Sequence, residues 1–177
     1  SYEAVLRLGI TTTTGDAEGA VVRERPVRVT PEQVRNAALE LTGPISQIPP
    51  MHSALKKDGK ALYQYARAGI EVERESRDVM IRELSVDLAL LESAQPAIKM
   101  RVTCSKGTYI RTLGEDLAER LGCGGHLTAL RRVATGGFSL AQAITLAQLE
   151  SMTEVQRVDC LLPVDALLAG HTVIRLD

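Results

Sequence analysis

Hydrophobic and polar positions follow two kinds of periodicity along the chain. Alternation at every second residue predicts strands, and repetition every three to four residues predicts helices. The clearest helical pattern runs from Thr108 to Leu121, where Ile110, Leu113, Leu117 and Leu121 form one apolar stripe. This stripe predicts an amphipathic helix that packs on the core.

A second helix is indicated by the residues at its ends. Thr30 is a suitable N-cap, Pro31 suits the first helical position, and Gln33 can complete a capping box. The helix is expected to run to about Thr42, with Gly43 as its C-cap.

The remaining pattern predicts strands, short helices and one irregular segment. Strands are predicted at 2–8, 20–29, 79–91, 97–104, 126–134 and 172–176. Short helices are predicted at 60–68, 145–152 and 163–168, and residues 44–59, with three prolines, should be irregular. Because strands outnumber helices in an irregular order, we expect a mixed α/β (α+β) fold, a largely antiparallel sheet flanked by helices.

The charge balance gives no general attraction to nucleic acid. The chain of 177 residues suits one domain, and 21 Lys and Arg stand against 22 Asp and Glu, for a net charge of −1. Residues 51–69 are locally basic, with Lys56, Lys57, Lys60 and Arg67 against Asp58 alone. On charge alone this run is explained as well by an ordinary solvated surface.

Cysteine usage and hydropathy indicate a cytoplasmic protein. The three cysteines form no CxxC pair or Cys/His cluster, so neither a zinc site nor any other metal site is expected. No signal peptide and no long apolar run are present, so no membrane span is expected. Ser1 is not an initiator methionine and residues 2–8 already form a predicted strand, so we expect a truncated chain.

The stretch from Cys104 to Thr112 has the strongest candidate chemistry. A predicted strand ends at Cys104, a turn follows, and a helix begins near Thr108. Arg111 falls in the first helical turn, where the helix dipole disfavours a cation, so it needs a carboxylate or phosphate partner. Tyr109 lies at the junction of strand and helix. From local physics alone, a solvated arginine and a core tyrosine explain the stretch equally well.

Several separate segments resemble the TruB family of pseudouridine synthases. Ser-Lys-Gly-Thr-Tyr-Ile-Arg-Thr-Leu at 105–113, and then Gly-Cys-Gly-Gly-His-Leu at 122–127, closely resemble the family's sequence. Similar segments occur in the family's order at 2–9, 12–19, 47–56 and 130–132. The resemblance covers about 2–165 and implies an incomplete pseudouridine synthase catalytic domain at 1–170, with an RNA-binding thumb segment at about 44–77.

The resemblance implies roles for particular residues. Tyr2 matches the tyrosine that stacks on the target base and helps to remove its C5 proton, and Arg111 matches the arginine that pairs with the catalytic aspartate. Tyr109 and Leu130 match residues that line the uridine pocket, and Asp16 matches a loop acid near the site. Four thumb residues are expected to approach RNA: Lys56, Lys60, Arg67 and His52, the last standing where relatives often have tyrosine.

The implied reaction is the isomerisation of uridine to pseudouridine in tRNA, at uridine 55 of the T loop. The base is cut from C1′, rotated and rejoined through C5, with an aspartate as nucleophile and without cofactor or metal. An arginine offsets the cost of burying that carboxylate, and an aromatic ring replaces the stacking that the flipped base loses. The expected partner is therefore the T arm of tRNA, with no obligate protein partner.

One departure from the family is large. Its catalytic aspartate lies in a Gly-x-Leu-Asp-Pro type of motif ahead of the strand that begins at Tyr2, and no such motif occurs here. Asp16 and Asp78 have different surroundings, so neither is assigned as a substitute. We therefore expect the isolated chain to be inactive, and we expect 171–177 to begin a linker to a C-terminal RNA-binding domain.

Three other interpretations remain open at this stage. The chain could be a non-catalytic RNA-binding module, because its nucleophile is absent. It could be a fragment of a guide-RNA-dependent pseudouridine synthase that works with partner proteins, although the plain thumb segment and the lack of basic tails favour the stand-alone bacterial type. The most remote alternative is an unrelated α/β domain.

Overall fold

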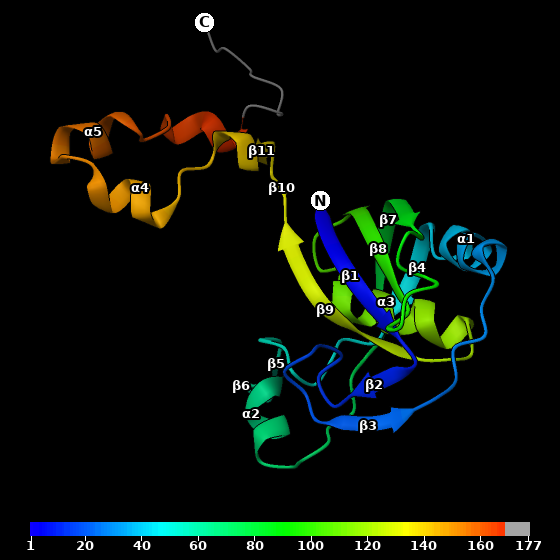
Figure 1. Ribbon diagram of the computed structural model, residues 1–177. Helices are drawn as coiled ribbons and strands as arrows, with labels where there is room; N and C mark the ends of the chain where they lie inside the picture. Colours follow the sequence, from blue (N-terminus) through cyan, green and yellow to red (C-terminus); the bar gives the residue numbers. More distant parts are fainter. Residues whose placement is uncertain (169–177) are drawn as a thin grey trace, which may run out of the picture. The chain divides into compact units, whose positions relative to one another are not determined.

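The computed structural model describes residues 1–168. The chain divides into two compact units, Ser1–Arg131 and Arg132–Asp177. The first unit is built on a five-stranded sheet with the strand order β4-β7-β8-β1-β9 (Figure 1). The strand expected at 172–176 and the linker expected at 171–177 lie outside the described residues.

The sheet is antiparallel, as expected. Its strands are β1 (Tyr2–Leu8), β4 (Gly43–Gln47), β7 (Arg77–Asp87), β8 (Ala97–Cys104) and β9 (Gly125–Arg132). β8 lies between β1 and β7 and pairs with both. β9 runs antiparallel to β1, because the Thr128 hydroxyl donates to the Val5 carbonyl while Gly9 bonds to Gly124.

Two helices contribute to the core on one face of the sheet. They are α1 (Pro31–Glu40) and α3 (Ile110–Arg120), which contact each other and strands β7 and β1 respectively. Leu113 and Leu117 of the predicted stripe are fully buried, as are Leu6 and Ile98 of the sheet. Burying each such side chain contributes about 1.5–3 kcal/mol, so the packing of the two helices on this face stabilises the unit.

The predicted caps of the first helix are confirmed. The Thr30 hydroxyl accepts from the Gln33 amide, and the Gln33 side chain accepts from the Thr30 amide, so the capping box is complete. The predicted end is wrong by about two residues. The helix ends at Glu40 and its C-cap is Leu41, so Gly43 begins β4 instead of capping the helix.

The segment at 44–59 is more regular than its prolines predict. Residues 43–47 form β4, in which Pro44 lies opposite Met80. Proline lacks an N–H and is tolerated in a sheet mainly at an edge, and β4 is the last strand on its side of the described sheet. Sheet pairing therefore overrides the local signal.

A small hairpin is a second correction in this region. It is formed by β5 (Lys56–Lys57) and β6 (Lys60–Ala61). Asp58 and Gly59 join them with φ of 51° and 78°, the conformation that a tight two-residue hairpin turn requires. The expected helix at 60–68 is correspondingly shorter, α2 (Leu62–Arg67).

The remaining elements are short. In the first unit, β2 (Ile10–Thr12) pairs with β3 (Val21–Glu24), so only part of the strand expected at 20–29 forms. The second unit contains β10 (Ala134–Thr135), β11 (Phe138–Ser139), η1 (Leu140–Gln142), α4 (Leu146–Ser151), α5 (Glu154–Asp159) and η2 (Val164–Leu168). The short helices expected at 145–152 and 163–168 are confirmed as α4 and η2, whereas α5 was not predicted.

Candidate active site

The candidate residues of the sheet converge on one of its ends. Tyr2 begins β1 and lies opposite Val102, two residues before β8 ends and the chain turns toward α3. β9 runs antiparallel to β1 and brings Leu130 toward the same end. β4 finishes here too, at Gln47. An antiparallel sheet thus collects residues that are up to 128 positions apart in the sequence.

Arg111 is held by three acceptors from two distant segments. Its Nη1 donates to the Asp16 carboxylate at 3.0 Å and to the Thr14 carbonyl at 2.9 Å, and its Nη2 donates to the His52 carbonyl at 2.7 Å. The requirement for a carboxylate partner, predicted from its place in the first turn of α3, is therefore met by Asp16. The Nε–H and one N–H of Nη2 have no acceptor within residues 1–168, so two donors remain for a further group.

Asp16 is fixed as a carboxylate. Its Oδ1 accepts from the Thr14 hydroxyl at 2.5 Å and from the Glu18 amide at 3.2 Å. Burial raises the pKa of Asp16, but these hydrogen bonds and the Arg111 guanidinium outweigh that effect, so the pKa lies below its ordinary value. The loop is anchored to the sheet where Asp16 forms a parallel bridge with Leu127 and the Leu127 amide donates to the Gly15 carbonyl.

A cavity of about 280 Å³ opens beside this ion pair. Asp16, Arg111, Leu127 and Leu130 are among its lining residues. Its volume is close to the lower end of the range of about 300–1,000 Å³ that is usual for small-molecule sites. The structure thus brings three of the predicted site residues around one cavity: Asp16, Arg111 and Leu130.

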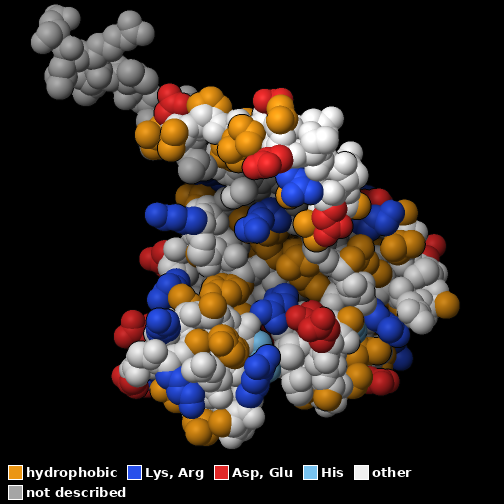
Figure 2. All heavy atoms as spheres, turned by 90° about the vertical axis from the view of Figure 1, so that its left-hand side faces the viewer, with side chains coloured by type: hydrophobic (Ala, Val, Ile, Leu, Met, Phe, Trp, Pro, Cys, Tyr) orange, Lys and Arg blue, Asp and Glu red, His pale blue; other side chains and the backbone are white. Residues whose placement is uncertain are grey.

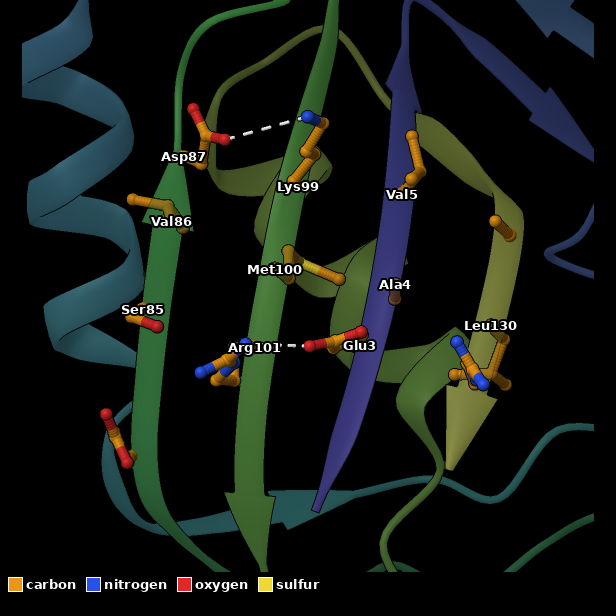
Figure 3. Close-up of a pocket in the computed structure, with 13 residues that line it drawn as sticks. Glu3, Ala4, Val5, Ser85, Val86, Asp87, Lys99, Met100, Arg101 and Leu130 are labelled. Atoms are coloured by element: carbon orange, nitrogen blue, oxygen red, sulfur yellow. Dashed lines mark hydrogen bonds and ion pairs between the residues drawn. The ribbon is translucent and has the colours of Figure 1, made fainter. Parts of the chain in front are cut away.

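A larger hollow of about 650 Å³ lies over strands β7, β8, β1 and β9 and includes Leu130 in its wall. Figure 3 shows that cross-strand ion pairs occupy it, with Arg101 directed at Glu3 and Lys99 at Asp87. The N–O distances are 2.7 and 3.8 Å, and both acids are partly exposed. The other two charged residues that line it, Glu83 and Arg131, are of opposite sign, so the lining has no excess of either charge and favours neither an anion nor a cation.

Tyr109 is the N-cap of α3, so the helix begins at Ile110, two residues after the start near Thr108 that the sequence predicts. The helix receives no side-chain cap from Tyr109. Instead, the buried amide of Gln47 accepts from the Tyr109 N–H at 3.1 Å and donates to the Tyr109 carbonyl at 3.3 Å. Sequence reasoning missed Gln47, because only the register of three strands brings it to this helix.

The predicted RNA-binding residues lie within the thumb segment. Lys56 and Lys60 are exposed on the hairpin, and Arg67 is exposed at the end of α2. Lys60 lies over the Tyr65 ring at 4.8 Å, and Arg67 over the Tyr63 ring at 5.3 Å. For His52 it is the backbone carbonyl that reaches Arg111, so a role for its ring stays a prediction.

Glu115 is a further titratable group near the ion pair, and sequence reasoning did not select it. It lies one helical turn after Arg111, and a Cβ atom at Gly15 would fall 2.8 Å from its carboxyl group. Burial first, and then the charge of Asp116, raise its pKa above the ordinary value. Gly15, with φ of +71°, is thus the residue that lets the Asp16 loop approach α3.

The surface charge agrees with the balance in the sequence. On the face drawn in Figure 2, Lys and Arg side chains are interspersed with Asp and Glu instead of forming one continuous basic surface. Within residues 1–168, no group of three or more His, Cys, Asp or Glu could hold a metal ion. None of the helices in this described part is long and apolar enough to cross a membrane.

Comparison with known families gives two matches that together span nearly all of the chain. Residues 1–110 match the family model described as TruB family pseudouridylate synthase (N terminal domain). Residues 111–169 match the model described as tRNA pseudouridylate synthase B C-terminal domain. The boundary between the two falls between Ile110 and Arg111, at the start of α3.

Curated relatives are similar along the whole chain. The tRNA pseudouridine synthase B of Ralstonia nicotianae is 61% identical over 168 residues, which are 95% of this chain and 54% of the relative. That of Ralstonia pickettii is 57% identical over 177 residues, 100% of this chain and 56% of the relative. The chain therefore spans about half the length of the curated relatives that it matches.

Solved structures share the fold. A chain in the crystal structure of a Cbf5-Nop10-Gar1 complex aligns with a TM-score of 0.57 and 26% identity, covering 84% of this chain and 34% of that one. A chain in the structure of an H/ACA RNP bound to a substrate RNA containing 2′-deoxyuridine aligns with a TM-score of 0.51 and 20% identity, covering 88% and 37%.

Proposed function

Because this chain belongs to the TruB family of pseudouridine synthases, we propose that it forms part of an enzyme that isomerises uridine to pseudouridine in tRNA, at uridine 55 of the T loop. The single observation that carries the proposal is Arg111 at the start of α3, bound to Asp16 beside a cavity that Leu130 also lines. This arrangement provides a fixed guanidinium with free donors at the wall of a pocket.

Each site residue has a different role in the proposed reaction. Arg111 orients and stabilises the nucleophilic carboxylate through its remaining N–H donors, while Asp16 holds the guanidinium in place. Tyr2 stacks on the flipped base and assists removal of its C5 proton. Tyr109 and Leu130 form walls of the uridine pocket and exclude water from it, which strengthens each electrostatic contact.

The thumb segment supplies the grip on tRNA. Lys56, Lys60 and Arg67 are exposed and would neutralise phosphates of the T arm. Tyr63 and Tyr65 limit the freedom of two of these cations, which reduces the entropy lost on binding. We place the reaction in the cytoplasm, where bacterial tRNA is found, and we propose that no protein partner is required.

The guide-RNA-dependent alternative has less support. The chain is 61% identical to a tRNA pseudouridine synthase B, against 26% for the chain of the Cbf5-Nop10-Gar1 complex. The thumb roles proposed here need no guide RNA.

The test of the proposal is reconstitution. The test uses a chimera, in which this chain is joined to the residues of the Ralstonia nicotianae relative that lie outside the matched region. Release of tritium from C5-labelled uridine in tRNA should be absent with the 177-residue chain alone and robust with the chimera. A folded chimera without activity would contradict the proposed function. Activity of the chain alone would show that the nucleophile lies within these residues.

A further inference from the structure

The side-chain amide of Gln47 is bound on both of its polar atoms by one backbone position 62 residues away. Its Oε1 accepts from the Tyr109 N–H at 3.1 Å, and its Nε2 donates to the Tyr109 carbonyl at 3.3 Å. Gln47 is only 2% exposed. Of the common side chains, only an amide offers a donor and an acceptor side by side at neutral pH, so the site is built for glutamine.

We infer that Gln47 is a positioning residue for the active site, an inference that rests on the proposed function. The bound residue is the N-cap of α3, which has no side-chain cap of its own, and its carbonyl also accepts from the Leu113 amide at 3.0 Å. Gln47 therefore fixes the backbone from which both the Tyr109 ring and, two residues later, the Arg111 guanidinium project.

A second link makes this connection stiffer. The carbonyl of His52, five residues after Gln47, accepts from Arg111 Nη2 at 2.7 Å. The start of the thumb segment and the start of α3 are thus joined by two links on either side of residue 110. Misplacement by about 1 Å can reduce the rate of an enzyme about a hundredfold, so loss of the Gln47 link should lower the turnover rate more than it weakens tRNA binding.

Replacement by glutamate separates positioning from simple packing, because Gln47→Glu changes one atom. A protonated Glu carboxyl can accept from the Tyr109 N–H and donate to its carbonyl, whereas the carboxylate cannot donate. Burial raises the pKa of a carboxyl group, and two basic groups act against that rise: Arg77, opposite position 47 in the β4–β7 pair, and Arg111, two residues after Tyr109. Activity should therefore be restored as the pH falls and the carboxyl group is protonated.

The experiment uses two readouts. In the chimera, single-turnover pseudouridine formation in tRNA is measured from about pH 5.5 to about pH 8.5 and expressed relative to the unsubstituted chimera, which removes the titration of Asp16 and Glu115. In the 177-residue chain, hydrogen exchange of the Tyr109 amide is measured by NMR. Gln33→Glu is the matched control: it adds the same charge, and Gln33 is exposed and uses only its acceptor oxygen, on Thr30.

The expected result for Gln47→Glu is a rate lowered by about tenfold to a hundredfold near pH 8, recovery near pH 5.5, and a KM for tRNA changed by less than about threefold. The exchange rate of the Tyr109 amide, relative to that of the unsubstituted chain at the same pH, should be raised at about pH 8 and return to normal at about pH 5.5. The control should match the unsubstituted chimera throughout. A full rate near pH 8, or a loss that does not depend on pH, would overturn the inference.

Gln47→Met guards against failure of the first variant to fold. Methionine is apolar and of similar length, so it preserves packing but can make neither hydrogen bond. It should lower the rate at every pH without recovery, and a Met variant with full activity would overturn the inference. If the unsubstituted chimera is inactive while the Tyr109 amide remains protected, the proposed function fails, and the positioning role fails with it.

Discussion

Arg111 and His52 are joined by a hydrogen bond of 2.7 Å from the guanidinium Nη2 to the backbone carbonyl. The first residue belongs to the candidate active site, and the second lies in the segment proposed to hold RNA. Because the acceptor is a backbone atom, the bond does not depend on which side chain occupies position 52. The position of the Arg111 guanidinium is thus tied directly to the backbone of the thumb segment.

Arg111→Ala in the chimera should lower the rate of tritium release about a hundredfold or more, because the nucleophilic carboxylate loses its charged partner. Arg35→Ala, which removes an exposed arginine from α1, is the matched control and should leave the rate unchanged. Circular dichroism should show that both variants remain folded. Near-normal release by Arg111→Ala would exclude the catalytic role.

Asp16→Asn should reduce the free energy of unfolding of the 177-residue chain by about 1–2 kcal/mol at neutral pH, since it removes a charged partner of Arg111 and Thr14. The pKa of Asp16 is lowered in the folded state, so its stabilisation is present above the unfolded pKa of about 3.9 and is lost as the pH falls through the folded value. Urea unfolding at about pH 7 and about pH 3 tests this. An equal difference at both pH values would contradict the assignment.

Glu115→Gln should have the opposite effect and stabilise the fold at neutral pH. The pKa of Glu115 is raised in the folded state, mainly by burial, so its ionised form disfavours folding at neutral pH. The variant should therefore raise the melting temperature at about pH 7, and the gain should disappear below the unfolded pKa of about 4.3. Glu92→Gln removes the same charge from an exposed position and controls for the change in net charge. Destabilisation at neutral pH would refute the prediction.

Loss of the thumb cations should flatten the salt dependence of tRNA binding. Each phosphate contact contributes roughly 0.7–0.9 to the slope of log K against log salt. Replacing Lys56, Lys60 and Arg67 by alanine should therefore reduce its magnitude by about two to three, as measured by filter binding with the chimera. A triple variant with the same loss of charge at Arg28, Arg35 and Arg82, all exposed, is the control. Equal slopes in the two triple variants would show that the thumb residues are merely solvated.

The sequence predicted best those features that depend on neighbouring residues. The Thr30 capping box and the stripe of α3 are local and are confirmed. The need of Arg111 for a carboxylate also follows from its place in the first helical turn. That this carboxylate belongs to Asp16, 95 positions away, could not be predicted, because the bridge between the Asp16 loop and Leu127 places it beside Arg111.

Features set by tertiary pairing escaped prediction. Residues 44–47 of β4 were expected to be irregular because the segment 44–59 contains three prolines, yet pairing with β7 holds them extended. The link from Gln47 to Tyr109 depends on the registers of β4, β7 and β8 together, which no local pattern contains. The roles of Tyr2, Tyr109, Leu130, Lys56, Lys60, Arg67 and the His52 ring stay predictions.

Pro44 also has a consequence for the behaviour of the chain at high concentration. An edge strand with an unbroken row of N–H donors is a template on which another copy can add a strand and begin aggregation. Pro44 removes one donor from β4, the outermost strand on its side of the described sheet. Pro44, which interrupts the strand pattern in the sequence, therefore disfavours self-association. Its replacement by valine would restore the missing N–H donor at the edge of the sheet.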